Sequence, residues 1–317
     1  MKVRALWFSV QTATFACALF TVLAFAGPLH WWVDLFSQFR AQYILILAAL
    51  APLLLLGRRW KAGVIAGLAI VANLAVVLPH TVPSSGVPRV GGHGSPVRLV
   101  SLNVLQGNQK YAEVERFLRE TNADVAVFQE VTPDWADALR GLSDLYPHQL
   151  PRGRKDSKGA ALLSKRPVGR LVFEELPGRG PIGAIIAEIE GEVPFTILGI
   201  HSHKPTSAGG AESQRIYFDW LAEKCRAENA GGRPVVLMGD FNSAPWSTAF
   251  RQFASRTHLR DTSRGVIFGA TWSFYHPQRL LIDHAFVSPE WWVLGRAVGP
   301  DVGSDHRPLI IDLALGG

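Results

Sequence analysis

Three long apolar stretches in the first 80 residues constrain the fold of this chain more than any other feature. They cover about residues 5–26, 43–56 and 62–78, and the only acidic side chain among the first 80 residues is Asp34. About 20 helical residues cross the ~30 Å hydrocarbon core of a bilayer. Buried helices of a soluble domain are the alternative, but three in succession with so little charge disfavour it. The sequence therefore predicts a membrane region with three transmembrane helices over residues 1–80.

The positive charge of the chain is concentrated in this region. Six of the 32 Lys and Arg residues and one of the 26 Asp and Glu residues lie before position 81, which leaves 26 basic and 25 acidic residues after it. The larger part of the chain is therefore nearly neutral. It lacks the basic surplus expected of a dedicated duplex-binding protein.

The distribution of Lys and Arg also predicts an orientation. Basic residues precede the first stretch at Lys2 and Arg4, and separate the second from the third at 58–61. The positive-inside rule places both clusters in the cytoplasm and everything after the third stretch outside. We therefore expect a multi-pass protein of the cell (inner) membrane with an extracytoplasmic, periplasmic C-terminal domain. Residues 24–26 (AFA) resemble a signal-peptidase site, so cleavage of the first stretch stays open.

The rest of the chain divides into a linker and one domain. Residues 81–96 are rich in Pro, Gly and Ser, which predicts a linker, and residues 97–317 form the predicted domain. Strands mixed with a few helices indicate a layered α/β sandwich with the helices outside two sheets. The predicted strands are 97–104, 123–128, 160–164, 171–174, 184–189, 195–201, 235–238, 280–287 and 309–315, and the predicted helices are 111–120, 211–228 and 247–253.

The stretch 234–245 (PVVLMGDFNSAP) is the most informative part of this domain. It predicts a buried strand, Val235 to Met238, followed by a turn at Gly239. Asp240 and Asn242 are two residues apart, so in extended chain they point to the same side. An Asx turn that merely closes the strand is the alternative.

The same pattern recurs along the domain, because several apolar runs end in a polar side chain that can bind a metal ion or a phosphate. Each one alone is more typical of a surface or capping residue. Together they predict a cluster at one end of a sheet. These residues are Asn103, Glu130, His201, Asp240 with Asn242, Asp283, and Asp305 with His306.

With these residues the chain resembles the endonuclease/exonuclease/phosphatase superfamily, which includes DNase I, sphingomyelinases and inositol-phosphate 5-phosphatases. The matching stretches appear in the order typical of the family and cover about residues 97–315. The resemblance implies an α/β (α+β) fold, a four-layer α/β/β/α DNase I-like sandwich, here preceded by an N-terminal transmembrane helical region. The stretches are SLNV, DVAVFQEV, GAALLSKRP, TILGIHSH, VVLMGDFNSAP, LLIDHAFVS and GSDHRPLIIDL.

The resemblance implies a metal site. Glu130 matches the principal ligand of a Mg²⁺ or Mn²⁺ ion, assisted by Asn103 and Asp305. Such a hard cation prefers carboxylate and carbonyl oxygens together with retained water.

The resemblance also implies catalytic roles. His306 matches the catalytic base and Asp283 its orienting partner. Asp240 and Asn242 would align the attacking water and the phosphate. His201 would contact another phosphate oxygen or help the leaving group depart.

The densest basic stretch, residues 152–158, offers candidate substrate-binding residues in Arg154 and Lys155, although such a loop is usually solvated. Where DNA-cleaving relatives carry charged residues, this chain has Leu105 and Thr132, which weakens the expectation of DNA binding.

The sequence thus predicts a membrane-anchored, divalent-metal-dependent phosphohydrolase, a hydrolase of phosphoric ester bonds acting outside the cytoplasm. Its substrate is a lipid headgroup, a small phosphoester or nucleic acid. Its other partner is the lipid bilayer, and no protein partner is inferred. The alternatives are an extracytoplasmic nuclease and a catalytically silent binding module on a membrane anchor. The silent module is disfavoured because every position needed for chemistry retains a competent side chain.

Overall fold

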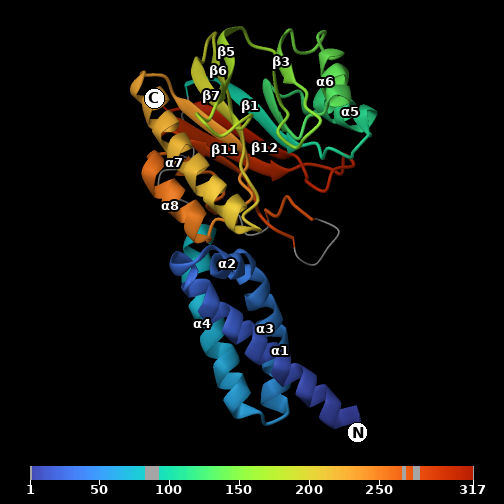
Figure 1. The fold of residues 1–317 in the computed structure, drawn as a ribbon, viewed down its shortest axis with the longest axis vertical. Coiled ribbons are helices and arrows are strands. Elements are labelled where there is room, and N and C mark those ends of the chain that lie inside the picture. The colour runs from blue at the N-terminus through green and yellow to red at the C-terminus, as the bar shows by residue number, and fades with distance from the viewer. Residues whose placement is uncertain (1, 83–92, 266–268, 274–278, 317) are drawn as a thin grey trace.

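The protein consists of a helical bundle attached to a two-sheet sandwich (Figure 1). A computed structural model describes residues 2–82, 93–265, 269–273 and 279–316. Most of the predicted linker, residues 83–92, lies outside the described residues. The first strand of the sandwich begins at His93, earlier than the predicted start at Val97.

Three long helices form the bundle: α1 (Lys2–Phe25), α3 (Arg40–Leu56) and α4 (Trp60–Thr81). Three candidate spans, Val3–Phe25, Trp31–Leu56 and Trp60–Thr81, are long and apolar enough to cross a membrane. The second span includes the short helical segments that precede α3. Leu47, Leu54 and Ala66 are fully buried between them, whereas large apolar side chains such as Phe8 and Leu56 are exposed on the outside. Apolar side chains on the outer face of a bundle are expected where lipid is the solvent.

A short irregular segment joins α1 to α3. It comprises the 3₁₀ turn η1 (Gly27–Leu29), the helix α2 (Trp31–Asp34) and the 3₁₀ turn η2 (Leu35–Phe39). We call residues 27–39 the elbow. It lies at the end of the bundle nearest the sandwich (Figure 1).

The one conspicuous polar residue of the third apolar stretch, Asn73, has its hydrogen bonds satisfied inside the bundle. Its Oδ1 accepts from Arg40 Nη1 at 3.1 Å and its Nδ2 donates to Thr21 Oγ1 at 2.7 Å. Buried polar groups need such partners in an apolar surrounding.

The sandwich contains two mixed six-stranded sheets. The first has the order β11-β12-β1-β2-β4-β3 and the second the order β5-β6-β7-β8-β10-β9. The strands of the first sheet are β1 (His93–Asn103), β2 (Val125–Gln129), β3 (His148–Arg152), β4 (Ala160–Ser164), β11 (Trp291–Val298) and β12 (Leu309–Leu315). Those of the second are β5 (Val168–Glu175), β6 (Gly183–Ile189), β7 (Phe195–His201), β8 (Val235–Asp240), β9 (Arg260–Asp261) and β10 (Asp283–Val287).

Helices cover the outer face of each sheet, which completes the predicted α/β/β/α layering. Helices α5 (Tyr111–Thr121) and α6 (Pro133–Arg140) pack on the first sheet, and α7 (Ala208–Ala230) and α8 (Thr248–Thr257) on the second. A third apolar core fills the space between the sheets. The predicted fold class is therefore confirmed.

The structure refines several predicted elements. Strand β8 continues through Gly239 to Asp240, so Gly239 is a strand residue and not a turn. A Cβ at Gly239 would lie 2.0 Å from the carbonyl oxygen of Ile200 on β7, so only glycine fits there. Strand β10 begins at Asp283, because Leu280 pairs instead with Trp272.

Four elements that local pattern did not predict complete the sandwich: α6, β3, β9 and β11. The start of α6 has a clear local cause, since Thr132 Oγ1 accepts from Trp135 N and Pro133 is the first helical residue. Strand β11 begins at Trp291, whose ring packs in the core 5.3 Å from that of Phe195.

Candidate active site

The strand register brings the predicted polar residues to one edge of the sandwich. In the first sheet, the parallel pairing of β1 and β2 sets Asn103 beside Gln129, directly before Glu130. In the second, Asp240 pairs with His201 on β7 and with Asp283 on β10. The two sheets face each other, so both sets of side chains open into the same space. The strand-end pattern is thus a consequence of topology.

Asn103 connects the two sheets. Its Nδ2 donates to Glu130 Oε1 and to Asp240 Oδ2, both at 3.1 Å, and its Oδ1 accepts from Leu105 N at 3.0 Å. The second oxygen of Glu130 accepts from the backbone N–H of Gln106 at 3.2 Å. One amide therefore holds two buried carboxylates from different sheets in a fixed arrangement.

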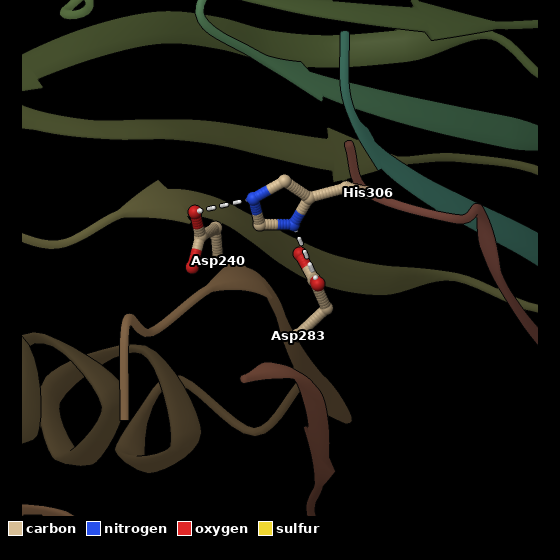
Figure 2. A group of neighbouring side chains, drawn as sticks. All are labelled: Asp240, Asp283 and His306. Atoms are coloured by element: carbon tan, nitrogen blue, oxygen red, sulfur yellow. Dashed lines mark hydrogen bonds and ion pairs between the residues drawn. The ribbon is translucent and has the colours of Figure 1, made fainter. Parts of the chain in front are cut away.

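His306 lies between two aspartates (Figure 2). Its Nδ1 is 2.8 Å from Asp283 Oδ2, and its Nε2 is 3.7 Å from Asp240 Oδ2. Burial alone would lower the pKa of His306, but the charges of Asp283 and Asp240 outweigh it and raise the pKa to about 9. Burial likewise would raise the pKa of Asp283, but His306 lowers it. The result is a buried imidazolium–carboxylate pair.

The position of His306 is fixed by Ser304. The hydroxyl of Ser304 donates to the carbonyl oxygen of Asn103 at 2.7 Å and accepts from His306 N at 3.1 Å. The backbone N–H of Asp283 in turn donates to Thr271 Oγ1 at 3.3 Å. These bonds attach the loop before β12 and the start of β10 to the same edge.

Asp240 and Asn242 form a tight local unit. Asn242 N donates to Asp240 Oδ1 at 2.8 Å, which is the Asx turn considered from the sequence. Asn242 Nδ2 donates to Ser202 O at 3.0 Å. Asn242 and Glu130 both have positive φ, 49° and 60°, a conformation that costs energy and that clusters at functional sites. The turn and the polar pair are therefore compatible readings of one segment.

His201 is a neutral imidazole in this surrounding. Burial, together with the charge of Lys158, lowers its pKa to about 3. Its Nδ1 lies 3.1 Å from the carbonyl oxygen of Ser157, which only accepts, so Nδ1 carries the proton. Its Nε2 then presents a lone pair 3.5 Å from Asp240 Oδ2 and 4.0 Å from Glu130 Oε1.

This donor set fits a hard divalent cation. The lone pair of His201 Nε2 and the oxygens of Glu130 and Asp240 converge, and three carboxylates, Glu130, Asp240 and Asp283, are buried together at this edge. A cation would offset that negative charge, and carboxylate oxygens are the ligands Mg²⁺ and Mn²⁺ prefer. Asp240, Asp283 and His306 also place potential ligand atoms within 4.8 Å of one another. Of these three residues, His306 is already hydrogen-bonded to Asp283, which favours an acid–base role for His306 over a metal-ligand role.

The remaining predicted residues make other contacts. Asp305 is half-buried, and its Oδ2 accepts from Trp272 Nε1 at 3.0 Å. Arg154 forms a two-point ion pair with Asp156. Lys155 is exposed, and its carbonyl oxygen accepts from Gln106 Nε2 at 2.6 Å.

Lys158 lies at the site, but the sequence indicated it only as a member of the basic stretch 152–158. Burial lowers its pKa, and the charges of Glu130, Asp156 and Asp240 oppose that shift. Ser304 and Thr271 were not predicted either, because a hydroxyl two residues before a histidine or in a loop carries no distinctive pattern. The spacing of Lys158 behind Arg154 was the only available signal.

Comparisons with solved structures find the same sandwich. They include a Neisseria meningitidis 3'-5' exonuclease (TM-score 0.57, 23% identity, 68% of this chain and 98% of that one). D. rerio TDP2 complexed with a single-stranded DNA product is similar (0.60, 14%, 69% and 99%). So is an endonuclease/exonuclease/phosphatase family protein from Bacteroides thetaiotaomicron (0.56, 19%, 70% and 99%). At these identities the likeness concerns the fold.

No match was found among curated protein sequences. The sequence profile of the Endonuclease/Exonuclease/phosphatase family matches residues 100–306, about two thirds of the chain. That range begins within β1, just before Asn103, and ends at His306, so it spans every strand-end residue described above. Sequence and fold together show that the chain belongs to the endonuclease/exonuclease/phosphatase family.

Proposed function

We propose that this protein is a membrane-anchored, divalent-metal-dependent phosphohydrolase of the phosphodiesterase type. The observation that carries the proposal is the convergence of the His306–Asp283 pair with the Glu130–Asn103–Asp240 network at one edge of the sandwich. Such a combination of a base, an orienting carboxylate and a group of oxygen donors suits attack of water on a phosphate ester.

In its neutral form His306 serves as the general base, and Asp283 holds it in position through Nδ1. A cation bound beside Asp240 would offset the carboxylate charge that raises the pKa of His306 and so favour this neutral form. The oxygen of water bonds to phosphorus, its proton passes to His306 Nε2, and the ester P–O bond on the opposite side breaks. The departing oxygen takes a proton from solvent and His306 returns its proton to solvent, so a phosphodiester and water yield a phosphomonoester and an alcohol. Asp240 and Asn242 align the water and the phosphate. His201 contacts a phosphate oxygen or assists the leaving group in the tautomer that carries the proton on Nε2.

Glu130, with Asn103 and Asp305, would hold Mg²⁺ or Mn²⁺. When bound, the cation polarises a phosphoryl oxygen and offsets the negative charge that develops on the phosphate. Glu130 is the best-placed of the three, since its backbone conformation and two hydrogen bonds fix both of its oxygens. The fixed donors therefore need little rearrangement on binding.

The catalytic domain, residues 97–317, would lie outside the cytoplasm, anchored to the inner membrane by the three helices of residues 1–80 through the linker 81–96. This orientation follows from the basic residues at the end of the bundle away from the elbow, Arg58, Arg59 and Lys61. The elbow end would then face the periplasm together with the sandwich.

An extracytoplasmic nuclease is the second candidate, because one similar structure is an exonuclease and another holds a DNA product. Two of the arginines in the basic stretch are already engaged, Arg152 with Glu175 and Arg154 with Asp156. Engaged guanidinium groups are less available for the phosphate contacts that dominate nucleic-acid affinity. This observation favours a smaller phosphoester.

The test uses the full chain in detergent with Mg²⁺, assayed on bis-nitrophenyl phosphate, plasmid DNA and phospholipid. His306→Ala should lower turnover by about 10² to 10⁴, with the thermal unfolding curve retained. His148→Ala, on the edge strand β3, is the matched control and should retain activity. Full activity of His306→Ala would refute the assignment of the base.

A further inference from the structure

The catalytic edge is the edge by which the sandwich is attached to the helical bundle. The elbow residue Gln38 accepts from Ala244 N at 2.6 Å. At the start of α3, Gln42 Nε2 donates to Arg279 O at 2.8 Å, and at the end of α4, His80 O accepts from Gly265 N at 2.8 Å. Ala244 and Arg279 each lie four residues from a catalytic aspartate. The segments next to the catalytic aspartates are therefore attached to the elbow end of the bundle.

The loop between β7 and α7 lies between the site and the elbow. One cavity is bounded by Pro205 and Ala208 on this side and by Leu29 and Trp31 of the elbow on the other. The same loop continues from His201, so its opposite flank faces the catalytic centre. One loop therefore lines both a cavity at the catalytic centre and a cavity at the elbow.

A second cavity, of about 470 Å³, adjoins the catalytic centre at His201. It is lined by Lys158 and Lys204 and by Ser157, Ser207 and Ser213. Among the described residues that line it, none is acidic. Ammonium groups and hydroxyls bind anionic and hydroxyl-bearing groups and disfavour a cationic one.

We propose that the substrate is an anionic phospholipid of the adjoining leaflet, whose hydroxyl-bearing headgroup occupies the cavity of Lys158 and Lys204. The phosphate would then lie beside His201 and His306, with the acyl chains remaining in the bilayer next to the elbow. This inference rests on the proposed hydrolase function and specifies its substrate class. Phosphatidylglycerol has a net negative charge and a headgroup with hydroxyls. The headgroup of phosphatidylcholine carries a positive charge, which the two lysines would repel.

The experiment reconstitutes the full chain with Mg²⁺ in phosphatidylcholine vesicles that contain phosphatidylglycerol, with the sandwich facing outward. Turnover of phosphatidylglycerol is compared with that of its deacylated form, glycerophosphoglycerol, and with bis-nitrophenyl phosphate. Phosphatidylglycerol should be hydrolysed at least about tenfold faster than the deacylated diester at equal bulk concentration, and phosphatidylcholine more slowly than phosphatidylglycerol.

Lys204→Gln tests the cavity. Removal of one charged contact should lower the ratio of phosphatidylglycerol to bis-nitrophenyl phosphate turnover about tenfold. Arg226→Gln, exposed on α7 away from the cavity, is the control and should leave the ratio unchanged. An unchanged ratio in Lys204→Gln would refute the headgroup assignment.

The outcomes separate the two proposals. Hydrolysis of bis-nitrophenyl phosphate with no preference for the acylated diester overturns the lipid inference and keeps the phosphohydrolase. Faster turnover of plasmid DNA than of phosphatidylglycerol overturns the lipid inference in favour of nucleic acid. A chain inactive on every one of these substrates overturns both.

Discussion

The side chain of Gln38 accepts a hydrogen bond from the backbone N–H of Ala244, 206 residues later in the chain. Gln38 belongs to the elbow between α1 and α3, and Ala244 lies two residues after Asn242 in the loop that follows β8. The carbonyl oxygen of Gln38 also accepts from Trp246 Nε1 at 3.2 Å. The helical bundle is thus part of the structure that positions Asp240 and Asn242.

Gln38→Ala should destabilise this loop. The buried N–H of Ala244 would lose its acceptor, which costs about 1–3 kcal/mol. We expect a lower unfolding temperature in detergent and reduced turnover of bis-nitrophenyl phosphate, because Asn242 would be less firmly held. Gln38→Glu keeps an acceptor oxygen and should retain more of both. Equal loss in the two variants would show that the hydrogen bond is not the cause.

Asp34→Ala should loosen the start of α8. The carboxylate of Asp34 accepts from Thr248 N at 2.9 Å and from Ala249 N at 3.4 Å, so it caps this helix from the elbow. Loss of a capping side chain typically costs about 1 kcal/mol. Hydrogen exchange of residues 248–252 should accelerate, and Asp34→Asn should restore part of the protection. Unchanged exchange in Asp34→Ala would contradict the capping role.

The strand-end residues were predictable because their positions follow from two local facts. An apolar run such as 125–128 forms a strand, and the polar residue after it, Glu130, must leave the sheet at that strand's end. Parallel pairing of β1 with β2 and of β7 with β8 then collects such ends at one edge. The strand pattern and the sheet topology therefore agree at these positions, without the contacts of loop side chains.

The direction of loop side chains was not predictable by the same route. Asp305 follows a strand-end pattern as well as Asp283 does, but its carboxylate accepts from Trp272. Arg154 stands in the basic stretch with Lys158, but an aspartate two residues away engages it. Sequence spacing determines which face of a sheet a strand residue occupies. In a loop, the direction of a side chain depends on which partner lies near it in space.

The elbow was missed for a related reason. Its helix and 3₁₀ turns are too short to give a periodic signal, and the apolar stretches on either side dominate the hydropathy. Its role depends on contacts with residues about 200 positions later, such as Asp34 with Thr248. No local pattern contains that information.

His284 should make stability depend on pH. The ring is buried against Phe241 and Phe250, and its Nε2 lies 2.9 Å from Ser243 O. Burial lowers the pKa of His284 to about 4. The charge of Arg296 lowers this pKa further, whereas the charges of Asp261 and Asp283 oppose the shift. Between pH 6.5 and 4 the unfolded chain binds this proton and the folded chain does not. The contribution of His284 is therefore complete above pH 6.5 and falls as pH decreases, by on the order of 3 kcal/mol at pH 4.

The comparison is thermal unfolding of the wild type and of His284→Phe across that range. At pH 7 the variant should be less stable by about 1 kcal/mol, because Ser243 O loses its donor. Near pH 4.5 the order should reverse, since phenylalanine carries no titrating group. Parallel stability curves for the two proteins would contradict the buried neutral state of His284.

Asp283→Asn should lower the turnover of bis-nitrophenyl phosphate by about 10² to 10⁴, because the amide no longer supplies the charge that orients and stabilises His306. Asp137→Asn, exposed on α6, is the control. The double variant with His306→Ala separates the roles: if Asp283 acts through His306, the double variant should be no slower than His306→Ala alone. Multiplying effects would instead show that Asp283 contributes independently, for instance through the alignment of Asp240, and the pair would not be a catalytic unit.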